Sequence, residues 1–274
     1  MSDGLKRKEF VGWVGAAGAT AALAPQIGTE PAEAATQKPQ KPLPKQQKTL
    51  RGEPLAFTFL TPPERAFVEA AAERLIPADE HGPGAREAGV AYYIDQQLAG
   101  AWGTGAGQYR QGPWETGTPE QGYQLNMIPQ QLYRVGIAQT NAYCRNKYGK
   151  TLATLSPALQ DEVLRALEAG TITLAGLPAK TFFDTLFNNT VEGFFADPLY
   201  GGNRDKVGWK AIGFPGVAAA YVGVIEKYNV RYKAAPVGIA DVEQGVAADP
   251  DQHAHEDEHR QRVAMMHERT AREA

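Results

Sequence analysis

The feature that most constrains the fold is the aromatic-rich segment of residues 178–195. Pro178 stands where a helix can begin, and the apolar side chains after it recur at helical spacing. They are Phe182, Phe183, Leu186, Phe187, Val191, Phe194 and Phe195. A helix that is apolar around much of its circumference normally lies at the centre of a core. We therefore expect other helices to pack around this one.

Five further segments carry helix signals, and strand-like alternation is scarce. The first begins at Thr61, with Pro62 at the first helical position and Glu64 placed to complete a capping box. After a turn at residues 81–84, a second helix runs through Val90, Ile94 and Leu98 to Gly100. The others span about residues 129–149, 156–170 and 217–228, and we interpret Ser156 with Gln160 as a second capping box. These patterns predict a single all-α domain of about six helices over residues 57–240, with long loops rich in Gly and aromatic residues.

One of those loops, residues 100–127, is long for a compact domain, and loops of this length tend to be functional. It carries Trp102, Tyr109, Trp114 and Tyr123. Aromatic side chains on a long loop suit a surface that binds a partner protein. Equally, they can pin the loop to the core of its own domain, and the sequence alone leaves both interpretations open.

The N-terminus has the pattern of an export signal. Basic residues at 6–8 precede an apolar run over residues 11–24, which is too short to cross a bilayer as a helix. Arg7, Lys8 and Phe10 resemble the core of a twin-arginine (Tat) signal, with Lys8 in place of the second arginine. An ordinary secretory signal or an uncleaved tail is the alternative. The small residues Ala32 and Ala34 favour cleavage after position 34.

Composition limits the chemistry of the chain outside this signal. Residues 35–56 form a Pro-, Gln- and Lys-rich linker, and residues 241–274 form a polar, His-rich tail that we expect to be disordered. The net charge of −3 argues against a nucleic-acid partner. Cys144 is the single cysteine, so it cannot form an internal disulfide, and we interpret it as a small buried hydrophobic residue rather than a reactive thiol.

Several constellations imitate catalytic or metal sites. His255, Glu256 and His259 match H-E-x-x-H, but their surroundings are polar and a third ligand is missing from the motif. The predicted domain contains one histidine, His81, which is too few for the Glu-x-x-His pairs of a di-iron bundle. The Gly-rich residues 103–107 follow no strand, as a nucleotide-binding loop would require. We therefore expect no catalytic residue, cofactor or metal in this chain.

Residues 195–216 form the most specific motif, with the sequence FADPLYGGNRDKVGWKAIGFPG. This block resembles the signature of the gluconate 2-dehydrogenase subunit 3 family, the small subunits of membrane-bound flavin dehydrogenases for sugars and sugar acids. Shorter matches are LIPAD at 75–79, GPGA at 82–85, AGV at 88–90, ID at 94–95 and GYQ at 122–124. The likeness covers roughly residues 57–232 and the signal.

The resemblance implies a complex of three kinds of subunit. A glucose–methanol–choline-type subunit carries FAD and oxidises the substrate, and a c-type cytochrome subunit carries haem c and passes the electrons to quinone. The small subunit is an accessory subunit that bears the Tat signal, so the flavin subunit is exported with it through the Tat translocase. We therefore expect a periplasmic location, associated with the membrane through the complex.

A Gly- and Pro-rich loop beside a rigid aromatic helix is also a physically sensible docking surface. Its candidate contact residues are of types that suit protein interfaces: Tyr200, Asn203, Arg204, Trp209 and Phe214, with Trp114 and Tyr123 from the central loop. The alternative for the block is a structural loop that closes the helical core. The alternative for the whole chain is a freestanding periplasmic binding or scaffold module without a dehydrogenase partner.

Overall fold

The structure, a computed structural model, describes residues 56–115, 117–118, 121, 124–217, 228–229 and 235–246. The predicted signal, the linker up to residue 55, Tyr123 and the H-E-x-x-H motif lie outside these residues. So does nearly all of the helix predicted over residues 217–228.

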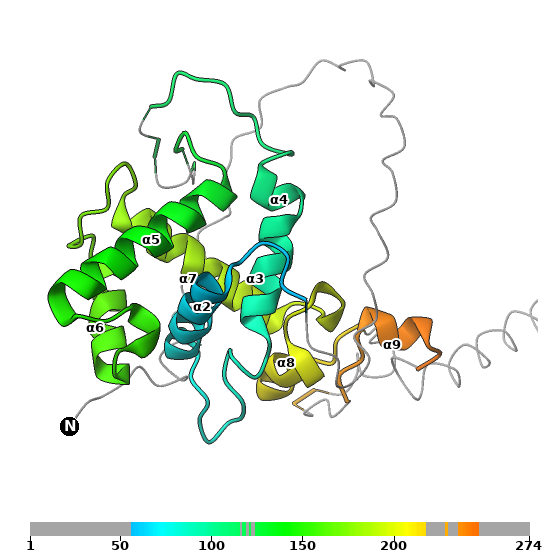
Figure 1. Ribbon diagram of the computed structural model, residues 1–274. Helices are drawn as coiled ribbons and strands as arrows, with labels where there is room; N and C mark the ends of the chain where they lie inside the picture. Colours follow the sequence, from blue (N-terminus) through cyan, green and yellow to red (C-terminus); the bar gives the residue numbers. More distant parts are fainter. Residues whose placement is uncertain are drawn as a thin grey trace, which may run out of the picture. The chain divides into compact units, whose positions relative to one another are not determined.

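The described part of the chain is all-α, as predicted, with eight α-helices and no named strand (Figure 1). Five predicted helices are confirmed, while α4, α8 and α9 are short helices that the apolar spacing did not indicate. The helices are α2 (Pro62–Leu75), α3 (Val90–Ala99), α4 (Ala101–Thr104), α5 (Pro129–Tyr148), α6 (Pro157–Glu168), α7 (Ala179–Phe195), α8 (Val207–Ile212) and α9 (Ile239–Glu243).

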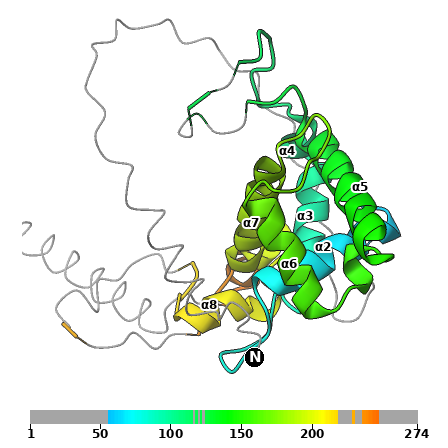
Figure 2. The ribbon, with the colours of Figure 1, turned by 90° about the vertical axis from the view of Figure 1, so that its left-hand side faces the viewer.

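The aromatic helix α7 lies at the centre of this domain, as its sequence predicts. It contacts α2, α3, α5, α6 and α8, and Figure 2 shows α5 and α6 beside it. The ring of Phe182 is fully buried and lies 6.1 Å, centroid to centroid, from the rings of both Phe67 on α2 and Tyr133 on α5. Gly136 on α5 makes this approach possible, because a Cβ there would collide with the Phe182 ring.

The two predicted helix starts differ in their capping. Glu64 accepts hydrogen bonds from the backbone N–H of Thr61 (2.9 Å) and from its hydroxyl (2.6 Å), so the predicted contact between these residues is present. The capping box predicted for Ser156 and Gln160 is wrong, because Gln160 falls one residue beyond the third helical position that the motif requires. Its side chain instead donates to the carbonyl of Leu152, at 3.1 Å.

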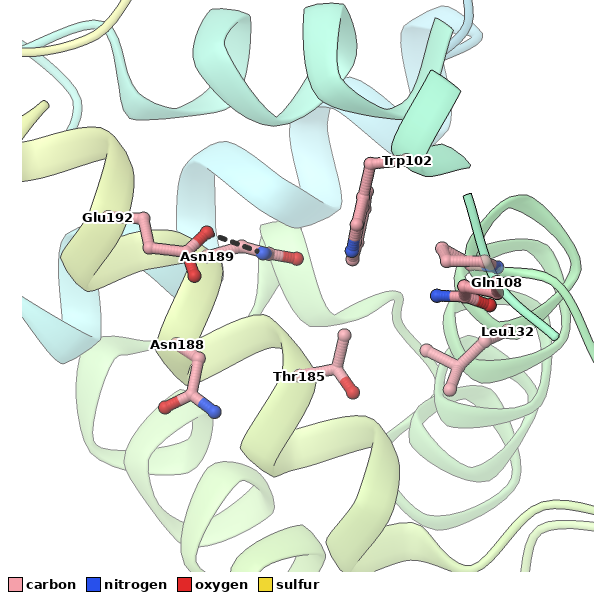
Figure 3. Close-up of a pocket in the computed structure, with 8 residues that line it drawn as sticks. Trp102, Gln108, Leu132, Thr185, Asn188, Asn189 and Glu192 are labelled. Atoms are coloured by element: carbon pink, nitrogen blue, oxygen red, sulfur yellow. Dashed lines mark hydrogen bonds between the residues drawn. The ribbon is translucent and has the colours of Figure 1, made fainter. Parts of the chain in front are cut away.

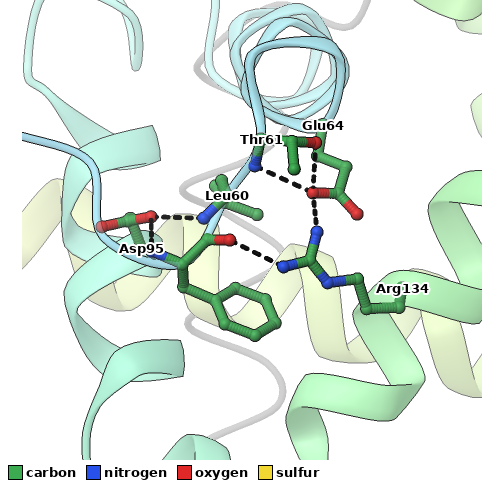
Figure 4. Close-up of polar contacts among 6 residues, drawn as sticks. Leu60, Thr61, Glu64, Asp95 and Arg134 are labelled. Atoms are coloured by element: carbon green, nitrogen blue, oxygen red, sulfur yellow. Dashed lines mark hydrogen bonds and ion pairs between the residues drawn. The ribbon is translucent and has the colours of Figure 1, made fainter.

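Two charged side chains fasten residues 58–60 to the bundle (Figure 4). The carboxylate of Asp95 on α3, fully buried, accepts backbone N–H bonds from Thr58 (2.8 Å), Phe59 (3.0 Å) and Leu60 (2.7 Å). From α5, Arg134 stacks on the Phe59 ring at 4.3 Å and donates to its carbonyl at 2.8 Å. These contacts fix residues 58–60 against α3 and α5.

Candidate docking surface and pocket

The block of residues 195–216 lies against the end of α7. It contains two 3-10 turns, Pro198–Tyr200 and Arg204–Lys206, followed by α8. Asn203 organises it from inside, since its N–H donates to the carbonyl of Gly193 and its amide to that of Ala196, both at 2.8 Å. The Asn203 side-chain oxygen accepts from the N–H of Gly208, also at 2.8 Å.

The glycines of the block allow backbone to lie directly on backbone. A Cβ on Gly202 would lie far inside van der Waals distance of the Gly193 carbonyl oxygen on α7. A Cβ on Gly208 would meet the Phe194 carbonyl in the same way. Since no side chain fits between these segments, this part of the sequence pattern follows from close packing.

The predicted contact residues of the block divide into two groups. Asn203 and Trp209 are buried, and the Trp209 indole donates to the Phe195 carbonyl at 2.7 Å, so both shape the block from within. Tyr200 and Phe214 are 45% and 42% exposed, and Arg204 is exposed as well. That these outward side chains contact a partner stays a prediction.

Ile212, Trp114 and Trp102 also concern the prediction that exposed side chains contact a partner. Ile212, 53% exposed at the end of α8, was missed because one isoleucine in a short helix carries no surface signal. Trp114 is 38% exposed in the central loop, with the Arg110 guanidinium 5.2 Å from its ring. The start of that predicted loop is helix α4, whose Trp102 points into a pocket.

Residues 235–246 fold back onto the block. The N–H of Val217 donates to the Val237 carbonyl at 2.8 Å, and Asp197 accepts from the N–H of Ile239 at 2.8 Å. Lys206 forms an ion pair with Asp241. Burial alone would raise the pKa of Asp241, but Lys206 and the Gly238 N–H outweigh it and lower this pKa. Helix α9 therefore crosses the boundary predicted at residue 240.

The pocket lies between α4, α5 and α7 and has a volume of about 190 Å³ (Figure 3). Apolar surface comes from Trp102, Pro129 and Leu132, and polar groups come from Gln108 and from a stripe on α7. The stripe consists of Thr185, Asn188, Asn189 and Glu192. Their spacing places all four on one face of this aromatic-rich helix. This polar face is the sequence signal for the pocket, and the spacing of apolar residues alone does not reveal it.

A chain of hydrogen bonds connects this stripe to the buried core. The hydroxyl of Tyr133 donates to Asn189 Oδ1 at 2.8 Å, and Asn189 Nδ2 donates to Glu192 Oε2 at 3.0 Å. Burial raises the pKa of Tyr133 well above its ordinary value, with Glu192 adding to the effect. Burial also raises the pKa of Tyr93 on α3 to about 12, helped by the charge of Glu192 and by a hydrogen bond with it. Both phenols are thus neutral at physiological pH.

Tyr93 connects the pocket to the block. Its ring lies against Gly193, where a Cβ would approach to 2.8 Å, and the phenol of Tyr200 is close enough to contribute to its raised pKa. From α4 to the block, the order is therefore Trp102, Glu192, Tyr93 and Tyr200. We call this set the aromatic–acidic strip.

Among the described residues, there is no group of three or more His, Cys, Asp or Glu side chains placed to hold a metal ion. Cys144 is buried, and burial raises its thiol pKa to about 11, which fits its interpretation as a small hydrophobic residue. None of the helices in the described ranges is long and apolar enough to span a membrane.

Comparison with known proteins shows the family to which this chain belongs. Residues 62–216 match the family described as gluconate 2-dehydrogenase subunit 3, and the match includes both the pocket and the block. Because it covers more than half of the chain, the protein belongs to this family and is an accessory subunit of a dehydrogenase complex. Searches of curated proteins and of solved structures gave no match.

Proposed function

We propose that this protein docks on the FAD-carrying subunit of a sugar or sugar-acid dehydrogenase and escorts it through the Tat pathway to the periplasm. FAD and haem c belong to the flavin and cytochrome subunits, and the substrate binds the flavin subunit. The docking surface is the outer side of the block, with Tyr200, Phe214 and Ile212, continued by the aromatic–acidic strip.

One observation carries the docking proposal: the block is fixed from inside while large side chains project from it. Asn203 and Trp209 anchor the block through hydrogen bonds to the end of α7, so Tyr200 and Phe214 need little ordering when a partner binds. A preorganised surface loses less conformational entropy on association. Tyrosine is also among the residue types that dominate the energy of protein interfaces.

The escort proposal is supported by the N-terminal sequence. Arg7, Lys8 and Phe10 form a Tat-like core, and the Tat pathway transports folded proteins. A partner attached before transport is therefore carried along without a signal of its own. This arrangement requires a complex that is stable in the cytoplasm, which links export of the flavin subunit to the docking surface.

Docking is tested by co-expressing this chain with a candidate flavin-type dehydrogenase subunit from the same genome and purifying the two together. The double variant Tyr200→Ala/Phe214→Ala should lower the affinity for the flavin subunit by about 30-fold or more, the effect of losing two interface anchors. Tyr228→Ala is the matched control, because Tyr228 is 82% exposed outside the block. Equal affinity of the double variant and the control would contradict the assigned surface.

Escort is tested separately by replacing Arg7 and Lys8 with glutamine and measuring where the flavin subunit accumulates. The expected result is loss of the flavin subunit from the periplasm together with this chain, while the two still co-purify from the cytoplasm. Full export of the flavin subunit despite the substitutions would show that it does not depend on this signal. A flavin subunit that never binds the wild-type chain would instead support the freestanding module.

A further inference from the structure

The pocket beside α7 combines an unneutralised carboxylate with an aromatic face. Glu192 accepts hydrogen bonds from Asn189 and Tyr93, which are both neutral. The ion pairs found among the described residues involve other carboxylates and leave Glu192 without a cationic partner. A carboxylate whose neighbours are neutral favours binding of a positive group from outside the domain.

Trp102 supplies the second half of a cation site. Its ring points into the pocket from α4, across from the polar stripe of α7 (Figure 3). Positive groups are attracted to the face of an indole, and this attraction strengthens where water is partly excluded. Trp102 and Glu192, the latter at an exposed position, line the same 190 Å³ pocket, so an aromatic face and a carboxylate belong to one site.

The rest of the lining suits a guanidinium on an apolar stem. Pro129 and Leu132 provide apolar surface for methylene groups, which a charged side chain buries while its head stays hydrated. The side-chain oxygens of Gln108, Thr185 and Asn188 can accept several N–H bonds around the head. A planar guanidinium both stacks on an aromatic ring and offers five N–H donors, whereas an ammonium offers three.

We infer that this pocket binds an arginine side chain of the dehydrogenase partner, which stacks on Trp102 and pairs with Glu192. This inference rests on the proposed docking function, and it specifies the partner's surface as basic at the contact with α4 and α7. The continuity of the aromatic–acidic strip supports it, because Tyr93 connects Glu192 to Tyr200 at the edge of the block. One partner surface can thus cover the exposed block residues and fill the pocket.

The pocket is tested first in the full chain without a partner. Nα-acetyl-L-arginine methylamide is titrated while the indole N–H resonance of Trp102, assigned with Trp102→Phe, is followed by NMR. The neutral citrulline analogue is the matched ligand control. We expect the Trp102 resonance to shift with the arginine compound, and Glu192→Gln to weaken this binding about five- to tenfold through loss of the ion pair.

Glu168→Gln is the matched protein control, since it removes the same charge from an exposed position at the end of α6. It should bind the arginine compound as the wild-type chain does. Glu192→Gln keeps an oxygen that can accept from Asn189, so an unchanged thermal midpoint shows that the variant is folded. An unmoved Trp102 resonance, equal binding of the citrulline compound, or equal effects of the two glutamine variants would each overturn the assignment.

The second test places the same variants in the complex with the flavin subunit. Glu192→Gln should weaken the complex about fivefold or more relative to Glu168→Gln, and Trp102→Leu should weaken it as well. If both pocket variants assemble like the control while Tyr200→Ala/Phe214→Ala does not, the pocket inference is wrong and the docking proposal stands. If the wild-type chain does not bind the flavin subunit, the docking proposal itself fails, and the pocket inference fails with it.

Discussion

The helical core and the block of residues 195–216 are both well packed, but different interactions stabilise them. In the core, apolar side chains such as Phe182 fill the space between α2, α5 and α7. In the block, the Asn203 side chain forms hydrogen bonds with the Ala196 carbonyl and the Gly208 N–H. Glycines there allow the backbone of the block to lie directly against that of α7. Apolar packing accepts many residues of similar volume, whereas hydrogen bonds to fixed atoms accept few. Conservative substitutions should therefore destabilise the block more than they destabilise the core.

The largest effect is expected in the core. Phe182→Ala should lower the free energy of unfolding by about 3–5 kcal/mol, because it leaves a cavity at the centre of the bundle. Phe182→Leu keeps most of the apolar volume and should cost about 1.5 kcal/mol or less. Urea denaturation of the two variants measures both values. A leucine variant as unstable as the alanine variant would show that the core also requires one particular side chain.

The block should respond strongly to a much smaller change. Gly202→Ala adds one methyl group against the Gly193 carbonyl, and we expect a loss of about 1–3 kcal/mol from the resulting overpacking. Gly107→Ala is the matched control, because a Cβ at Gly107 meets no atom within 4 Å. The control should stay within about 0.5 kcal/mol of wild type in the same denaturation experiment. If Gly202→Ala and Gly107→Ala had equal free energies of unfolding, the block would not depend on close backbone packing as proposed.

Removing the side-chain hydrogen bonds of Asn203 tests in a second way whether the block depends on particular side chains. Asn203→Ala leaves the Ala196 carbonyl and the Gly208 N–H without their partner, which should cost about 1–3 kcal/mol. It should also weaken binding of the flavin subunit, since Tyr200 and Phe214 lose their rigid support. Asn146→Ala, at an exposed position of α5, is the control and should change neither the free energy of unfolding nor the binding much. Thermal melting and co-purification measure the two effects.

The same contrast explains what the sequence could predict. Five helices follow from apolar spacing, and four of them also have Pro at or beside their first residue, because these signals are local. The pocket requires Trp102 to meet residues some 90 positions later on α7, and no local pattern contains that contact. The burial of Asn203 and Trp209 is likewise set by the return of the chain onto α7. The residue types suggested that the block is an interface. The fold then shows that some of the predicted contact residues are buried and support the block, whereas others are exposed.

A smaller effect is expected where α2 meets α5, outside both the deepest core and the block. Burial alone would raise the pKa of Glu64, but hydrogen bonds from Thr61 and Arg134 outweigh it and hold this pKa below its ordinary value. The Glu64 carboxylate therefore stabilises the fold fully at a pH above the pKa that Glu64 has in the unfolded chain. This stabilisation is lost as the pH falls through the lower pKa that Glu64 has in the folded protein. Glu64→Gln should cost about 1 kcal/mol at neutral pH and less in acid. Unfolding measured across this acidic range checks the trend, and a constant difference between variant and wild type would contradict it.

The smallest effect concerns backbone conformation in the block. Asp205 and Lys206 both have positive φ angles, 54° and 58°, which glycine adopts more easily than they do. Asp205 is exposed, so Asp205→Gly should relieve this strain and raise the free energy of unfolding by about 0.5 kcal/mol, after the added freedom of the unfolded chain is counted. Lys206→Gly relieves the same strain but removes the ion pair with Asp241, and should give no gain. If both variants gained the same free energy of unfolding, relief of backbone strain would outweigh the ion pair between Lys206 and Asp241. The block would then tolerate substitutions more readily than its hydrogen bonds indicate.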